Sequence, residues 1–131
     1  HMRINIICAI LIFSLFISAP VFSADCSEAY SDADDAYTYA RRGLNSDSLD
    51  DAVYYAKKAM SDAEDAMYAA EDCGCDDAYS SAEDAYSYAR KAYYSGEYDA
   101  TIYYLRKAKS SADDAMDYAE DCNNEIIPPA M

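Results

Sequence analysis

The chain contains two copies of one 49-residue unit in direct succession, residues 26–74 and 75–123. Just over half of the aligned positions are identical, and in each copy a cysteine stands first and second-to-last. Tandem copies of one structural unit are expected to fold alike and to bury their apolar faces against each other. The sequence therefore predicts a single domain over residues 25–123 that consists of two similar halves.

Alanine recurs in each copy in alternating steps of three and four residues, which is the spacing of one face of an α-helix. Turn-forming stretches at 45–48 and 95–97 divide each copy into two such runs. The first copy has Ala29, Ala33, Ala36 and Ala40, then Ala52, Ala56, Ala59, Ala63, Ala66 and Ala70; the second copy repeats the series with Thr101 and Leu105 at two of the positions. Each copy is predicted to form a helical hairpin.

The cysteines support one register of these hairpins. The antiparallel register that sets alanine against alanine in the first copy also sets Cys26 opposite Cys73. The equivalent register in the second copy sets Cys75 opposite Cys122. We therefore predict these two disulfides, and each closed loop should stabilise the fold by about 4 kcal/mol in the chain-entropy model.

Alanine faces let helices approach closely but bury little apolar area, so a second apolar surface is expected between the hairpins. Large residues that directly follow the alanine positions are expected to form it. They are Tyr30, Tyr37, Leu44, Val53, Met60 and Met67 in the first copy and Tyr79, Tyr86, Tyr93, Ile102 and Met116 in the second, where Lys109 is expected to extend its amine to the edge. The predicted fold is all-α, an antiparallel four-helix bundle made of two tandem 49-residue disulfide-clamped helical hairpins.

The first 24 residues differ from the rest in composition. His1 is expected to be a cloning residue, and the segment from Arg3 to Ala24 has a cation, an apolar run and small terminal residues, the layout of a secretory signal peptide. An exported protein is expected in the periplasm or outside the cell, without membrane association once this segment is removed. Residues 124–131 are expected to form a flexible tail.

The sequence argues against an enzyme. The single histidine is His1, no glycine-rich phosphate loop is present, and no serine or cysteine has a base partner in the sequence. Paired carboxylates are too numerous to indicate one catalytic pair. A net charge of -15 disfavours nucleic-acid binding. Neither an enzymatic activity nor a cofactor is predicted.

Fifteen tyrosines in a chain without tryptophan are a large excess. Four of them fall opposite the alanine faces, where a monomer would expose them: Tyr54, Tyr68, Tyr94 and Tyr103. Exposed tyrosines form contact surfaces at low entropic cost, although Tyr54 and Tyr103 could also simply cover the loop region. With the acidic surface, they predict a non-enzymatic binding or assembly module whose partner is a protein, a glycan or a second copy of the chain.

Paired basic residues lie near the predicted loops, and acidic residues gather at the cysteine end. The plain interpretation is a solvated surface that keeps the protein soluble. The alternative function is a periplasmic metal-ion binding protein, which would use the four cysteines for Zn²⁺ or Cu⁺ or the acidic clusters for weak binding of divalent cations. The candidate acidic ligands are Asp32, Asp34, Asp35, Asp113, Asp114 and Asp117.

Residues 85–108, AYSYARKAYYSGEYDATIYYLRKA, resemble a tetratricopeptide helix pair, in which small residues on two packed helices flank a glycine-containing turn. Ala85, Tyr88 and Ala89 stand at the signature positions of the first helix, and Thr101 and Leu105 at those of the second. The sequence departs from that pattern in lacking a terminal proline and in its longer period, since tetratricopeptide repeats have about 34 residues. The resemblance implies a peptide-binding or protein-binding scaffold.

Overall fold

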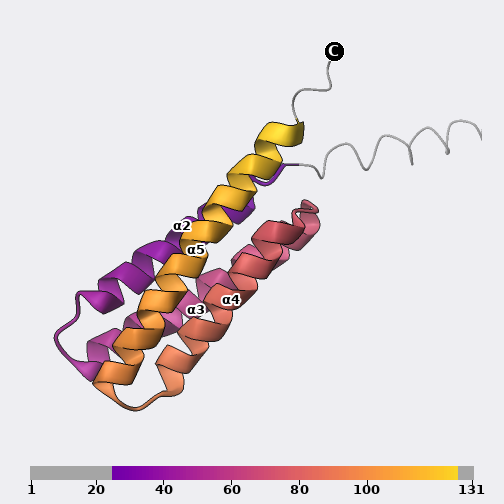
Figure 1. The fold of residues 1–131 in the computed structure, drawn as a ribbon. Coiled ribbons are helices and arrows are strands. Elements are labelled where there is room, and N and C mark those ends of the chain that lie inside the picture. The colour runs from indigo at the N-terminus through magenta and orange to yellow at the C-terminus, as the bar shows by residue number, and fades with distance from the viewer. Residues whose placement is uncertain (1–24, 127–131) are drawn as a thin grey trace, which may run out of the picture.

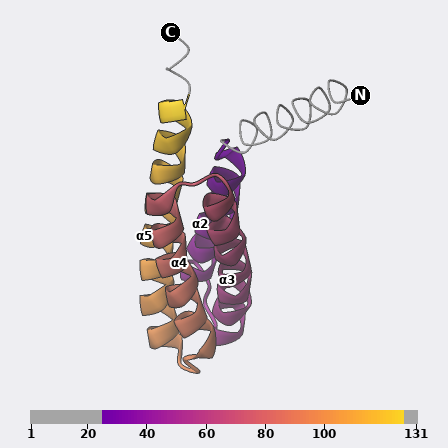
Figure 2. The same ribbon diagram turned by 90° about the vertical axis from the view of Figure 1, so that its right-hand side faces the viewer.

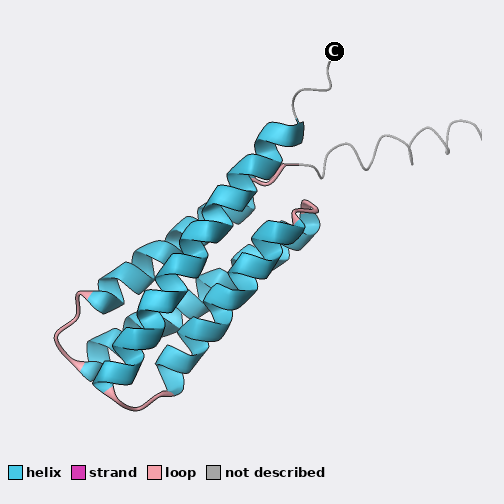
Figure 3. Cartoon of the chain, in the orientation of Figure 1, coloured by secondary structure: helices cyan, strands magenta, loops and turns pink. Residues whose placement is uncertain are grey.

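The computed structural model describes residues 25–126, which form four helices packed as a closed bundle (Figure 1). The helices are α2 (Ser27–Leu44), α3 (Leu49–Asp72), α4 (Asp76–Tyr94) and α5 (Tyr98–Ile126). Successive helices run antiparallel, and α2 packs against α5 about as extensively as α3 packs against α4 (Figures 1 and 2). The connections are short (Figure 3). The predicted all-α, antiparallel four-helix fold is confirmed.

Two predicted segments fall wholly or partly outside the described residues. These are residues 1–24, for which a cloning residue and a signal peptide are expected, and residues 127–131 of the expected tail. The last helix continues through Asn124 to Ile126, so α5 extends past the predicted domain end at residue 123.

The helices end where the turn-forming residues predicted. Residues 45–48 join α2 to α3, and residues 95–97 join α4 to α5. Ser48 caps α3, because its hydroxyl accepts a hydrogen bond of 3.2 Å from the backbone N–H of Asp51. Between the hairpins, Gly74 takes a φ of 75°, a conformation that glycine adopts without steric cost.

The alanine faces of all four helices meet on the bundle axis, and each of these alanines is at most 2% exposed. Two layers in the middle of the core take one alanine from every helix. One layer contains Ala33, Ala66, Ala82 and Ala115, and the next contains Ala36, Ala63, Ala85 and Ala112. These are the residues that the predicted register of each hairpin sets against one another.

The contact between the two hairpins differs from the prediction. We expected the large residues beside the alanines to form a separate interface, but the alanines of both hairpins share the same layers. The large residues are half-buried around these layers, with Met67 and Met116 beside one and Tyr37 and Tyr86 beside the next. Because alanine is small, all four helices approach one axis closely, and larger side chains are displaced to its periphery.

Both predicted disulfides are present. The Cα atoms are 5.3 Å apart in Cys26–Cys73 and 6.1 Å apart in Cys75–Cys122. The sulfur atoms of Cys26, Cys75 and Cys122 all lie within 4.8 Å of one another, so the two bridges are adjacent at one end of the bundle. Disulfides are typical of proteins in oxidising compartments.

Candidate binding surfaces

The four tyrosines that were predicted to face outward are exposed. The exposed fractions are 55% for Tyr54, 56% for Tyr68, 67% for Tyr94 and 51% for Tyr103. They are distributed over three helices, since Tyr54 and Tyr68 belong to α3, Tyr94 ends α4 and Tyr103 belongs to α5, and α3 and α5 lie diagonally across the bundle. Two tyrosines that sequence reasoning did not single out are also exposed, namely Tyr98 and Tyr118.

Tyr54 belongs to a cluster of rings and cations on the face formed by α2 and α3. Its ring meets that of Tyr55 edge-on, with 5.2 Å between centroids, and Tyr55 stacks with Tyr39 of α2 at 6.3 Å. The Lys58 amine lies 5.9 Å from the Tyr39 centroid and 5.5 Å from that of Tyr54. The Arg42 guanidinium lies 5.4 Å from the Tyr39 centroid. We name these five residues the first tyrosine cluster.

The second copy reproduces this arrangement on α4 and α5. Tyr103 meets Tyr104 edge-on at 5.2 Å, and Tyr104 stacks with Tyr88 at 6.5 Å. The Lys107 amine lies 5.8 Å from the Tyr88 centroid and 5.4 Å from that of Tyr103, and the Lys91 amine lies 5.5 Å from Tyr88. These five residues are the second tyrosine cluster. Since α3 and α5 each pack between α2 and α4, the two clusters lie on opposite faces of the bundle.

The sequence alone did not predict that these tyrosines and the basic pairs form common clusters. Part of the signal is local, because Tyr54 and Lys58 are four residues apart, as are Tyr103 and Lys107, and residues at this spacing are neighbours on a helix surface. The other part is the contact between helices, which the hairpin register determines. A cation over an exposed ring contributes roughly 0.5–1 kcal/mol, so the cations help to fix the orientation of the rings.

Charge divides the bundle along its length. Every lysine and arginine within residues 25–126 lies in 41–58 or 90–109, near the two intra-hairpin loops. All but five of the acidic residues lie in the other half, toward the disulfides. The hairpin fold predicts this separation, because each basic pair near the end of one helix is brought beside the pair at the start of the next.

The acidic residues predicted as alternative metal ligands are spread over the surface. Asp34, Asp35, Asp113, Asp114 and Asp117 are exposed. Asp32 is the exception among the six, because its side chain is half-buried. Within residues 25–126, the side chains whose ligand atoms lie close enough together to hold a metal ion are those of Cys26, Cys75 and Cys122, so these six residues do not converge on one site.

Asp32 forms part of a different group, which we name the acidic cluster: Glu28, Asp32 and Asp35 of α2 with Asp62 and Asp65 of α3. Burial raises the pKa of Asp32 to about 6, with further contributions from the charges of Asp65, Glu28 and Asp35. Burial likewise raises the pKa of Asp62 to about 6, with contributions from Asp35, Asp65 and Asp32 that the Lys58 charge opposes. Crowded carboxylates on two helices thus hold protons more strongly than isolated ones.

The alternative metal site at the cysteine end needs a different chemical state of the sulfurs. Zn²⁺ and Cu⁺ are bound by thiolates, whereas the four sulfurs are bonded in pairs as disulfides. The proximity of the Cys26, Cys75 and Cys122 sulfurs would favour such a site only after reduction.

Comparison with family models, with curated proteins and with solved structures finds no match to this chain. The tetratricopeptide resemblance therefore rests on residues 85–108 alone. The two hairpins share one closed core, whereas tetratricopeptide repeats stack into an open superhelix. Within residues 25–126, no helix combines the length and the apolar character needed to cross a membrane.

Proposed function

We propose that this protein is an exported, non-enzymatic module for binding and assembly, acting in the periplasm or outside the cell through its two tyrosine clusters. One observation carries the proposal. The same five-residue arrangement recurs on opposite faces with centroid and cation distances that agree within a few tenths of an ångström. Many other positions differ between the copies, yet Tyr54 and Tyr103 are retained although they lie outside the alanine core.

The chemistry of the clusters favours an acidic partner surface. Tyrosine rings offer broad contact area with a polar tip, and the adjoining lysines and arginines supply positive charge. The acidic half of a second copy of this chain has the complementary charge. A contact between unlike surfaces of two copies leaves one free surface of each kind, so such contacts extend into a ring or an open chain of molecules.

Two clusters on opposite faces would let one molecule hold two neighbours. The net charge of -15 opposes association at low ionic strength. At about 0.15 M salt the Debye length is about 8 Å, so long-range repulsion is screened while direct contacts persist. The proposed assembly should therefore be weakest in salt-free buffer and stronger at physiological ionic strength.

The test measures the weight-average mass by light scattering and sedimentation over a range of concentrations. The unmodified protein should form larger species as concentration rises, and Y54A/Y103A should remain monomeric. Y118A, which removes an exposed tyrosine outside both clusters, is the matched control and should assemble normally. An unmodified protein that stays monomeric at every concentration and salt level would contradict assembly.

Binding of a divalent cation by the acidic cluster is the second candidate function. Asp32 and Asp62 have raised pKa values, first through burial and then through the charges of neighbouring carboxylates, and a cation would relieve both effects as a proton does. Millimolar Ca²⁺ should then raise the thermal unfolding midpoint of the unmodified protein but not that of D32S/D62S. Equal shifts in both proteins would indicate non-specific screening and remove this candidate.

A further inference from the structure

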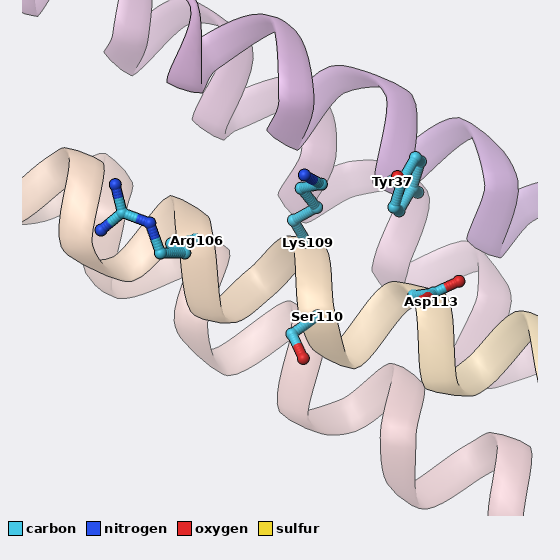
Figure 4. Close-up of a pocket in the computed structure, with 5 residues that line it drawn as sticks. All are labelled: Tyr37, Arg106, Lys109, Ser110 and Asp113. Atoms are coloured by element: carbon cyan, nitrogen blue, oxygen red, sulfur yellow. The ribbon is translucent and has the colours of Figure 1, made fainter.

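A small pocket of about 280 Å³ lies between the two hairpins (Figure 4). It is lined by Tyr37 of α2 and by Arg106, Lys109, Ser110 and Asp113 of α5. Figure 4 shows the Lys109 side chain extending from α5 toward α2, beside the ring of Tyr37. Because residues of both hairpins form the walls, the pocket exists only when the hairpins are docked.

Positive charge is concentrated around this pocket. The Lys109 amine lies 5.6 Å from the centroid of the Tyr37 ring, and the Arg41 guanidinium lies 6.0 Å from the same centroid. Arg106 adds a third cation, and Asp113 is the only acidic residue in the lining. The local charge is therefore positive in a chain whose net charge is -15, and such a location attracts anions.

Lys109 is a position at which the two copies differ in chemical type. The equivalent residues on the face formed by α3 and α4 are Tyr86, Lys57, Met60, Ser61 and Glu64. Four of the five pocket residues thus have a counterpart of the same type, whereas Lys109 corresponds to Met60. Met60 packs against the alanine core, as an apolar side chain beside that core should. The lysine amine adds nothing to packing against alanine and instead lies beside the Tyr37 ring at the pocket, which favours a role in binding.

We propose that the Tyr37–Lys109 pocket binds a tetrahedral oxyanion, a phosphate or sulfate group. Lys109 would donate charge-assisted hydrogen bonds to it, and Arg106, which also lines the pocket, would add positive charge. The Tyr37 hydroxyl is a further donor in the same lining. The pocket volume suits a compact group. This inference is independent of the proposed assembly, because the tyrosine clusters lie on other faces of the bundle.

The test is an NMR titration of the isotope-labelled protein with inorganic phosphate and, separately, inorganic sulfate at constant ionic strength. Saturable shifts are expected at the amides of residues 106–113 and at Tyr37. K109M should weaken binding by at least about tenfold, because a charge-assisted hydrogen bond to the anion is lost. Its unfolding midpoint, measured in parallel, should stay close to that of the unmodified protein.

The second copy supplies a matched gain-of-function control. M60K places a lysine among Lys57, Ser61 and Tyr86, and should create a second saturable site with shifts on α3 and α4. Saturation by phosphate alone or by sulfate alone would identify the source of the group. Acetate at the same ionic strength should not saturate the site. Equal acetate binding, unchanged binding by K109M, or no saturable shift in the unmodified protein would each overturn the proposal.

Discussion

At the scale of single residues, the core contains one contact in which a larger side chain on one helix is matched by a smaller one on its neighbour. Gly43 of α2 is buried, and a Cβ atom built on it would lie 2.6 Å from Leu105 Cδ1 of α5 and 3.3 Å from Tyr55 Cβ. In the repeat alignment, Gly43 of the first hairpin corresponds to Ala92 of the second, and Leu105 of the second corresponds to Ala56 of the first. Both alanines belong to the same core cluster as Leu105. The pair of Gly43 and Leu105 thus corresponds to the pair of Ala92 and Ala56, so one large and one very small residue stand where the equivalent pair has two alanines.

This complementarity predicts a strong energetic coupling. G43A should destabilise the protein by about 1 kcal/mol, because the overpacking penalty of roughly 1–3 kcal/mol exceeds the gain of about 1 kcal/mol in helix propensity. L105A should destabilise it by about 3 kcal/mol through the cavity it leaves. In G43A/L105A the new methyl group occupies part of that cavity, so the double variant should be more stable than additivity predicts. Urea unfolding of all four proteins measures this, and strict additivity would contradict the interpretation.

At the scale of helices, the acidic cluster couples α2 to α3 in a way that depends on pH. The second copy carries Ser81 and Ser111 where the first has Asp32 and Asp62, so the burial and the charge repulsion that raise the pKa of these two carboxyl groups are specific to the first hairpin. When α2 packs against α3, the carboxylates of the acidic cluster repel one another. The corresponding repulsion between α4 and α5 is weaker, because serines replace two of the carboxylates.

The sign of the pH dependence follows from the direction of the shifts. The folded-state pKa of each aspartate, about 6, exceeds its ordinary value of 3.8, so the native state binds more protons between these values. The contribution of the pair to stability is complete below pH 3.8 and is lost as the pH rises through about 6. The unfolding midpoint should therefore decrease between pH 5 and pH 7.5, as differential scanning calorimetry can measure.

The corresponding variant is D32S/D62S, which gives the first hairpin the residues of the second. It should unfold at a higher temperature than the unmodified protein at pH 7.5 and show a weaker pH dependence. D117S/D121S removes the same number of exposed acids outside the acidic cluster and should retain the dependence. A dependence that persists unchanged in D32S/D62S would contradict this assignment.

At the scale of the whole molecule, the disulfides hold both hairpins closed at one end. Both bridges join residues 47 positions apart, so the chain-entropy model assigns them similar effects. The alanine layers that they support have little apolar area per residue, which makes an entropic contribution of about 4 kcal/mol from each bridge important to a domain of this size.

Removing one bridge should therefore cause a large loss of stability without changing the fold. C26A/C73A and C75A/C122A should each lower the free energy of unfolding by roughly 2–4 kcal/mol, with the helical circular dichroism spectrum retained at low temperature. Urea titrations measure the loss. Values below about 1 kcal/mol for both variants would indicate that the bridges do not act by restricting the unfolded chain.

The sequence by itself determined the helices, their turns, the register of each hairpin and both disulfides. These features are local or follow from folding one helix back on its neighbour, so the spacing of alanines such as Ala33 and Ala66 and the positions of the four cysteines are sufficient to predict them. The exposure of Tyr54 and Tyr103 followed from the same spacing, because they lie opposite the alanine faces.

Only the tertiary structure decided how the two hairpins meet. Alanine faces are uniform, so their spacing does not specify whether two hairpins share one core or pack through the larger residues beside it. That choice, set by how closely four small-residue faces can approach one axis, placed the tyrosine clusters on opposite faces. It also turned Lys109, a single mismatch in an apolar pattern, into part of a basic pocket with Tyr37 of the other hairpin.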